Sequence, residues 1–344
     1  MTAVTAGIGL PVRREPRTRG LLWATWRQHR VALLGIVAVL GALALLLLIT
    51  GRSMHSAYRT DGVAACIQSS SDTCQPALDL FRSHWDRLVQ TLPHLLLFAP
   101  LFIGGFVGAP MVAREIESGT FRFAWTQGVS RRRWLSVKVL ALAAAVTAVG
   151  FAFSALYSWW FAPVQPLYGR MDTGSAYELE GVVFATRTLL AFAMGVLIGA
   201  LTRRVVASMA ATGTLWFIVA FFSTTVLRKH IEAPIIAQQG TATANDGSAW
   251  VLSSWIQDAS GKHLSDNEVA TIIGPPPGPV VRSGGHVKAA FGGPDPLAQH
   301  GLTAWVSLQP GSRFWHFQLI EGSAYTALAV ALIAAAMAIV PRRT

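Results

Sequence analysis

Long apolar runs alternate with polar, charged segments along this chain, and each run is long enough to cross a membrane. The first run, Val31 to Thr50, has 20 residues and no charge, which at 1.5 Å per residue spans a hydrocarbon core of about 30 Å. It is too long and too far from the start for a signal peptide, so we expect a retained anchor. Five more runs follow, at 93–113, 137–161, 182–201, 205–227 and 322–340. The pattern predicts an all-α integral membrane protein with six transmembrane helices.

Composition and charge support this interpretation. The chain is 52% hydrophobic and 13% charged, against roughly 25% charged residues in an ordinary soluble domain. With both ends inside, the inner segments hold 16 of the 28 Lys and Arg residues but only 3 of the 17 Asp and Glu residues. Basic residues near span ends stay on the cytoplasmic side. We therefore expect a cell-membrane protein with both termini cytoplasmic, and we attribute the net charge of +11 to topology, not to nucleic-acid binding.

The predicted organisation has four parts. Residues 1–30 form a cytoplasmic tail and an interfacial helix, and residues 31–227 contain helices one to five, with an outer loop at 51–92 and a cytoplasmic loop at 110–138. Residues 228–321 form a large extracytoplasmic segment, and residues 322–344 form helix six and a cytoplasmic end. The outer segment is long enough for a small ordered domain, but its weak periodicity predicts no particular fold.

Aromatic and basic residues flank two of the spans. Trp23 and Trp26 precede the first span beside arginines, which fits either a helix lying in the interface or the ordinary flank of a span. A basic triplet followed by tryptophan precedes the third span and would lie among lipid headgroups. The predicted membrane-interface anchors are Trp23, Trp26, Arg131, Arg132, Arg133 and Trp134.

Small residues and prolines mark places where helices approach or end. Gly104 with Gly108, and Gly195 with Gly199, have the four-residue spacing that lets a neighbouring helix come close. We expect Pro110 to end the second helix at the inner surface.

Cys66 and Cys74 are the only cysteines, and both lie in the predicted outer loop. On an oxidising face they would form a disulfide worth roughly 2.6 kcal/mol by chain entropy. A metal site is the alternative, but two sulfurs without paired histidines make it the less favoured one. We predict a disulfide and no metal.

The motifs of common enzymes are absent from the sequence. It contains no G-x-x-x-x-G-K-[ST] loop for nucleotide phosphates, no H-E-x-x-H and no G-x-S-x-G. We therefore predict no catalytic residues and no cofactor in this chain. His94, Arg187 and Glu321 are ionisable groups near the outer ends of spans. Such groups can be functional, but we expect His94 and Glu321 to be solvated at the interface and Arg187 to extend toward it.

The cytoplasmic loop at 110–138 carries the most informative chemistry. Arg114 to Glu117 make one charged turn that Gly119 and Thr120 can stop. A short helix there would direct Glu115 and Glu117 outward to a partner. An ordinary positive-inside loop would explain the arginines of this segment but not its paired glutamates.

This loop resembles a known family. The run A-P-M-V-A-R-E-I-E-S-G-T-F-R-F-A-W-T-Q-G-V-S-R-R-R-W-L-S-V-K is similar to the first cytoplasmic loop of the permease subunits of type-2 ABC exporters, where R-E-x-E-x-G-T precedes a basic return into the membrane. Similarity continues at residues 23–30, 201–204, 312–321 and 342–343.

The resemblance implies a permease that pairs with a separate ABC ATP-binding subunit, which would hold ATP and Mg, and with a second permease copy or a paralogue. The loop would contain a coupling helix seated in the ATPase, with coupling residues Arg114, Glu115, Glu117, Gly119 and Thr120. The outer segment before helix six is much longer here than in the wider family.

Two other classes of function fit the same pattern. A sensor or scaffold would bind a ligand through its outer segment and signal through its inner loop. A membrane enzyme is the less favoured third class. An ATPase gene beside this one would favour the exporter, whereas a histidine kinase or sigma-factor gene there would favour the sensor.

Overall fold

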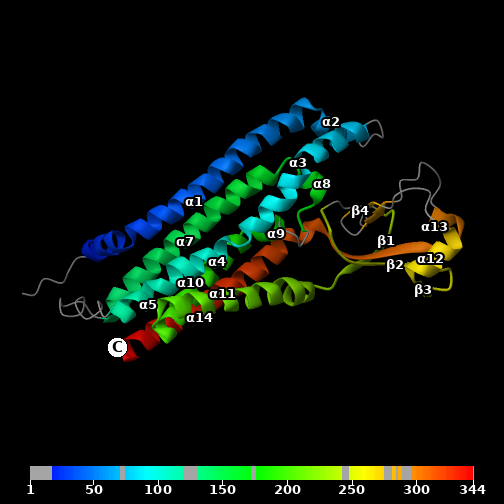
Figure 1. The fold of residues 1–344 in the computed structure, drawn as a ribbon. Coiled ribbons are helices and arrows are strands. Elements are labelled where there is room, and N and C mark those ends of the chain that lie inside the picture. Colours follow the sequence, from blue (N-terminus) through cyan, green and yellow to red (C-terminus); the bar gives the residue numbers. More distant parts are fainter. Residues whose placement is uncertain are drawn as a thin grey trace, which may run out of the picture.

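Helices dominate the computed structural model (Figure 1). The structure describes residues 18–69, 74–118, 131–171, 176–241, 248–274, 281–283, 286–288 and 296–343. Within these ranges, the helical stretches long and apolar enough to cross a membrane number six, as predicted, and they are Ala38–Thr60, Gln75–Ser118, Leu135–Phe161, Val183–Thr202, Val205–His230 and Gly311–Val340.

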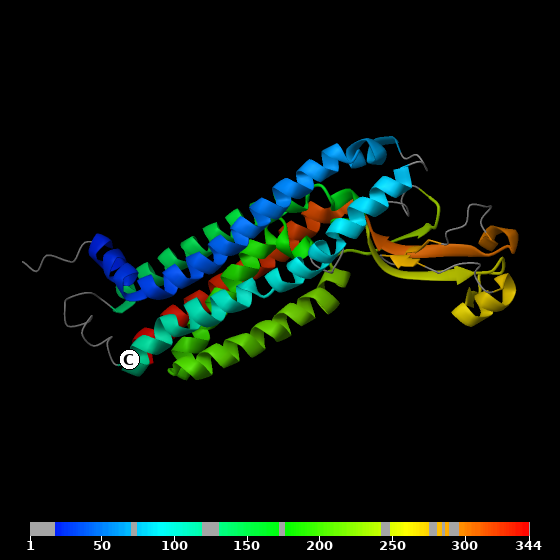
Figure 2. The ribbon, with the colours of Figure 1, turned by 45° about the horizontal axis from the view of Figure 1, so that its top comes forward.

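The first span lies in α1 (Thr18–Thr60), which extends beyond the predicted run at both ends. Figure 2 shows the first turns of α1 bent away from the axis of the rest of the helix. The side chains of Trp23 and Trp26 are outside the described set, so their role as interface anchors stays a prediction.

Helix α10 (Val183–Thr202) is the buried centre of the bundle. It packs against α5 (Ala109–Ser118), α7 (Arg131–Phe161), α11 (Val205–Phe222) and α14 (Phe314–Arg343). Its apolar residues are distributed around the whole helix and 83% of this span is buried, as expected for a helix enclosed by others.

The predicted glycine pairs meet each other across one helix contact. A Cβ built on Gly104 would lie 2.6 Å from the carbonyl oxygen of Ala191, and one on Gly108 would lie 2.5 Å from a carbonyl oxygen of α10. From the other side, Gly195 and Gly199 face backbone atoms of residues 104–109. Only hydrogen side chains permit this approach, so the four glycines set the distance between the second and fourth spans.

The second span is divided into several helical segments. The prediction that it ends at Pro110 is wrong. It consists of α3 (Gln75–Leu96), α4 (Ala99–Ile103), a π-helical turn at Gly104–Gly108, and α5 (Ala109–Ser118). Proline lacks the N–H that an α-helix needs and its ring crowds the preceding turn. The wider π turn just before Pro110 accommodates both effects, which lets the helix continue through the proline to Ser118.

The predicted disulfide is present between Cys66 and Cys74, whose Cα atoms are 5.3 Å apart. It joins α2 (Val63–Ser69) to the residue that precedes α3. Because α2 follows α1 after a short turn, the disulfide closes the connection between the first and second spans. Two short helices, α8 (Gln165–Tyr168) and α9 (Ala176–Leu179), lie in the next connection on this side.

The segment between the fifth and sixth spans, for which the sequence predicted no particular fold, contains a β-sheet, so the chain as a whole is not all-α as predicted. Its four antiparallel strands have the order β1-β6-β2-β3. The strands are β1 (Ile235–Gln238), β2 (Trp250–Gln257), β3 (His263–Leu264) and β6 (Thr303–Gln309). Ala237, Val306 and Leu308 form its small apolar core. β6 leads into α14 through a short turn at Gly311–Arg313, which couples the sheet to the sixth span.

Smaller elements complete this segment. Helix α12 (Asp266–Ile273) begins with a capping box in which Ser265 and Glu268 satisfy each other's backbone N–H groups. A two-stranded hairpin consists of β4 (Val281–Ser283) and β5 (His286–Lys288), and α13 (Pro296–Gln299) precedes β6.

The helical bundle has two distinct ends (Figures 1 and 2). The sheet lies beyond one end, which we call the sheet end. The start of α1, the end of α5 and the end of α14 lie at the other, which we call the terminal end. The chain therefore enters and leaves the bundle on the same side, as an even number of spans requires.

Candidate functional site

The predicted coupling residues lie at the terminal end, in the last turns of α5. Arg114, Glu115 and Glu117 belong to this helix, whereas Gly119 and Thr120 lie outside the described residues. The turns continue straight from the second span and do not form a separate helix lying across it. Residues three or four apart on α5 share a face, so Met111 and Glu115 point to the same side.

Glu115 points into the bundle, so the expectation that it faces outward is wrong. It is 4% exposed and accepts a hydrogen bond from Lys138 Nζ, which is also buried. The same ammonium group donates to the carbonyl oxygen of Met111 at 3.4 Å. This buried ion pair joins α5 to α7. A lysine within the apolar run of the third span was the signal that the sequence offered, because such a charge requires a partner.

Glu117 is exposed, but its carboxylate is engaged within the protein. Its Oε2 accepts a hydrogen bond of 2.9 Å from the backbone N–H of Val205, the first residue of α11. Arg203, two residues before Val205, has a left-handed backbone (φ 58°), which makes the tight turn between α10 and α11. The first N–H groups of a helix have no partner inside it and attract negative charge. Glu117 therefore caps α11 and joins it to α5.

The outward-facing surface at this end contains Arg114, which is exposed on α5. Arg133 is partly buried in the first turn of α7. Arg131, Arg132 and Trp134 belong to α7, but their side chains are outside the described set. Their predicted role as headgroup anchors stays a prediction.

A second cluster of charges is buried at the sheet end, around Arg228. The Arg228 guanidinium donates to Glu178 Oε1 at 2.8 Å and to both carboxylate oxygens of Glu321, at 3.1 and 3.2 Å. The guanidinium carbon also lies 4.0 Å from the centroid of the Tyr177 ring, in the geometry of a cation–π contact. Glu321 was expected to be solvated, but two arginine contacts hold it inside the protein.

Hydroxyl groups and a second arginine extend this cluster. Tyr325 donates to Glu321 Oε1 at 2.6 Å, and Ser223 donates to the same oxygen at 3.1 Å. Arg187 was expected to extend toward the interface but is buried, with its guanidinium about 6 Å from the rings of Trp216 and Tyr325. The side chain of His94, in contrast, is exposed, and its solvation at the interface stays a prediction.

The cluster has two cations and two anions, so its formal charges balance. Arg228, Arg187, Glu178 and Glu321 come from four different places in the sequence, and periodicity within one segment could not predict their meeting. Because removing one member would leave an uncompensated buried charge, the cluster holds α9, the end of the fifth span and α14 together.

Gln318, on α14, connects that helix to α9 and to the start of α10 through backbone groups. Its Oε1 accepts from the N–H groups of Val182 and Val183, at 3.0 and 2.9 Å, and its Nε2 donates to the carbonyl oxygen of Tyr177 at 2.8 Å. The amide side chain of Gln318 thus caps α10 and also holds Tyr177, the neighbour of Glu178 in the sequence.

Arg170 and Glu180 form a further pair beside this cluster, with Nε 2.6 Å from Oε2. Burial raises the pKa of Glu180, and the neighbouring Arg170 opposes that rise. No group of three or more metal-binding side chains occurs among the described residues. The chemistry of both ends is that of ion pairs and caps between helices.

A comparison with protein families assigns the chain to a family. Residues 37–228 match the family described as ABC-2 membrane transporter related, and this match covers more than half of the chain. The chain belongs to this family. Searches of curated proteins and of solved structures found no match. Members of this family are related to membrane permeases and typically lack a nucleotide-binding domain, so this chain is a multi-pass membrane protein related to ABC-2 transporter permeases.

Proposed function

We propose that this chain is the permease subunit of an ABC exporter and that its terminal end docks on a separate ATP-binding subunit in the cytoplasm. The observation that carries the proposal is the double attachment of α5. Its last turns hold α7 through the Glu115–Lys138 pair and hold α11 through the Glu117 cap. A single helix end therefore controls the start of two further spans.

This arrangement supports a mechanism for coupling. Arg114 and the segment that includes Gly119 and Thr120 would contact the ATPase, while Glu115 and Glu117 would transmit its movement. A buried ion pair and a helix cap resist separation more than apolar contacts that can slide. When the ATPase subunits close on ATP, displacement of α5 would move α7 and α11 with it.

The position of α5 against α10 extends the same connection to the centre of the bundle. Gly199 of α10 faces the backbone of Ala109 at the first residue of α5. The closeness of these backbones leaves no space for independent motion. We therefore expect α10 to follow α5, and the charge cluster around Arg228 to carry the movement to the sheet end.

A second permease copy or a paralogue would complete the transport path. The spans that begin at Ala38 and Val205 are the least buried of the six, with 17% of their residues buried. The exposed apolar residues on α11 include Val206, Phe217, Ile218 and Phe221. Lipid and a second permease are the two partners that such surfaces suit, and a path between two copies would use part of them.

Copurification tests the proposal. The tagged chain would be expressed with an untagged candidate ATP-binding subunit from a neighbouring gene, extracted in a mild detergent and isolated through the tag. We expect the ATPase to be retained by the wild type. We expect R114E to lose it, since a charged contact that is desolvated in an interface is worth roughly 2–5 kcal/mol.

The matched control is R82E, which reverses a charge on α3 near the sheet end. Among the described residues, Arg82 forms one long surface ion pair, with Asp79 at 4.0 Å, so this variant should retain the ATPase. A wild-type chain that retains no ATPase would contradict the proposal and favour the sensor or scaffold.

A further inference from the structure

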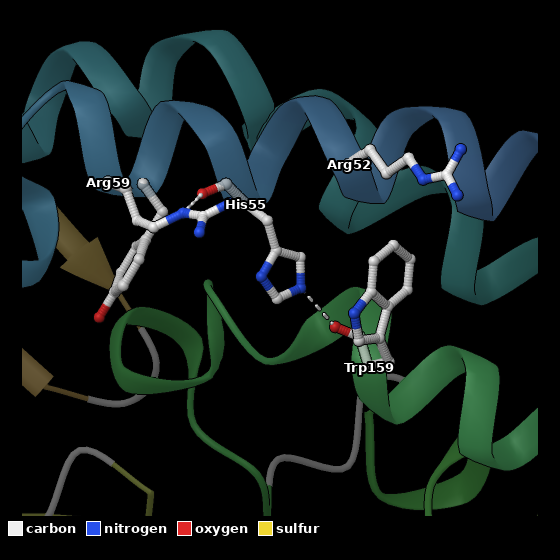
Figure 3. Close-up of a pocket in the computed structure, with 5 residues that line it drawn as sticks. Arg52, His55, Arg59 and Trp159 are labelled. Atoms are coloured by element: carbon white, nitrogen blue, oxygen red, sulfur yellow. Dashed lines mark hydrogen bonds between the residues drawn. The ribbon is translucent and has the colours of Figure 1, made fainter.

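A pocket of about 490 Å³ lies beside α1, close to the sheet end of the bundle (Figure 3). The residues that line it are Arg52, His55, Tyr58, Arg59 and Trp159. Four come from α1, and Trp159 comes from the end of α7. None of them belongs to the contacts that join α5, α7 and α11.

Close contacts between α1 and α7 fix the wall of the pocket that His55 and Trp159 form. The His55 ring stacks on the Trp159 ring, with centroids 4.9 Å apart and planes at 16°. His55 Nε2 donates to the Trp159 carbonyl oxygen at 2.9 Å, as Figure 3 shows. Gly51 makes the approach possible, since a Cβ there would lie 2.6 Å from the Trp159 ring.

The two arginines supply positive charge without a carboxylate partner. Among the residues that the structure describes, neither Arg52 nor Arg59 forms an ion pair, and both are exposed. Arg59 Nε donates to the carbonyl oxygen of His55 at 3.2 Å, which fixes this side chain along the helix. Arginine offers a planar array of donors that matches the oxygens of a phosphate group.

The pocket also lies at a boundary between apolar and polar surface. Leu45, Leu48, Arg52, His55 and Arg59 follow one another at spacings of three and four residues, so they share one face of α1. The two leucines are 57% and 37% exposed within the membrane-spanning stretch. Along this face, an exposed apolar surface changes to a cationic one at Arg52.

We propose that this pocket binds a phosphate group, as carried by the headgroup of an anionic phospholipid in the leaflet at the sheet end. Arg52 and Arg59 contact the phosphate oxygens, and His55 and Trp159 form the wall between them. An acyl chain lies along Leu45 and Leu48. Trp159 lies two residues before the end of the third membrane-spanning stretch, and tryptophan is enriched at such ends, between hydrocarbon and water.

The test uses the full-length chain, purified in an uncharged detergent, and isothermal titration calorimetry with three probes. These are dihexanoyl phosphatidylglycerol, dihexanoyl phosphatidylcholine and inorganic phosphate. We expect saturable binding of phosphatidylglycerol that is clearly tighter than that of phosphatidylcholine. Each arginine near an anionic lipid contributes about a fivefold gain in affinity, so R52Q/R59Q should bind about 30-fold more weakly.

The control variant R82Q/R87Q removes two arginines from α3 near the same end and should bind like the wild type. Inorganic phosphate that binds as tightly as phosphatidylglycerol, and is lost in R52Q/R59Q, would support the site and identify a soluble anion as its ligand. Equal binding of the two lipids by the wild type would overturn the proposal, whether or not the variants fold. So would wild-type affinity in a folded R52Q/R59Q.

Discussion

Replacing Lys138 with methionine tests the contact that joins α5 to α7. The change keeps the length of the side chain but removes its charge, and it leaves Glu115 buried without its cation. Breaking a buried ion pair from one side costs about 3–5 kcal/mol. For a large domain each kcal/mol lowers the melting temperature by about 2 °C, so we expect K138M to melt about 6–10 °C lower.

The double variant E115L/K138M separates the cost of an orphaned charge from the value of the pair. Glu115 Oε2 is buried and has no hydrogen-bond partner among the described residues, so the wild-type pair is incompletely satisfied. Replacing both partners of such a pair by apolar side chains is often neutral or stabilising. We therefore expect E115L/K138M to recover most of the melting temperature that K138M loses.

The assay is thermal unfolding of the purified chain in detergent, followed by tryptophan fluorescence and by the monodisperse fraction after heating. The result that would refute the reasoning is a double variant as unstable as K138M. A K138M chain that melts like the wild type would also refute it, since that would mean that Glu115 is hydrated.

Four further predictions follow from other contacts. G108V should fail to accumulate in the membrane, because its Cβ would meet a carbonyl oxygen of α10 at 2.5 Å. G105A is the control and should accumulate normally, because a Cβ at this position has no atom within 4 Å. Equal abundance of the two variants would contradict the close packing. Alkylation of the denatured chain should find no free thiol at Cys66 or Cys74 until reductant is added, and two free thiols in fresh membranes would disprove the disulfide. A cysteine at Ser253 should react with an impermeant thiol reagent in intact cells and one at Ser118 should not; labelling of Ser118→Cys from outside would reverse the proposed orientation. Hydrogen bonds from Ser265 and Lys262 lower the pKa of Glu268 to about 2, so the cap on α12 should be complete above about pH 4.5 and lost as the pH falls through 2. The measurement is the rate of amide hydrogen exchange in α12, compared between the wild type and E268Q. A ratio of the two rates that stays unchanged between pH 5 and pH 2 would contradict this prediction.

The membrane-spanning part of the fold could be predicted from the sequence because burial in lipid imposes a local rule. A run such as 182–201 must be apolar throughout and about 20 residues long, and no contact with another segment is needed to recognise it. The close-approach glycines at 104, 108, 195 and 199 could also be predicted, because each pair is recognised from its four-residue spacing within one segment. That these two pairs face each other was not predictable, since it depends on how two helices pack.

The sheet could not be predicted for the opposite reason. Strand β2, Trp250–Gln257, pairs along most of its length with β6, about 50 residues away in the sequence, and its polar and apolar residues do not alternate regularly. The register shifts between Val251 and Ser253, which disrupts the two-residue period on which strand prediction depends.

The candidate site was found in part. The segment at Arg114 to Glu117 was selected from the sequence as chemically unusual, but the sequence does not state which way a helix face turns. The continuation of the helix through Pro110 determines that Glu115 meets Lys138. Arg187 and Glu321 were singled out as ionisable groups near span ends, but their meeting with Arg228 and Glu178 was missed because the four residues come from separate segments.

The central claim is that α5 transmits work from an ATPase, and the rate of ATP hydrolysis in the reconstituted complex tests it most directly. E117A removes the cap on α11 at a cost of about 1 kcal/mol, which the fold should tolerate, and it leaves Arg114 on the docking surface. We predict that the wild-type chain stimulates hydrolysis by its ATPase partner, and that E117A still retains the partner but stimulates it little. An ATPase whose hydrolysis rate is the same with the wild type, with E117A and without any permease would contradict the account.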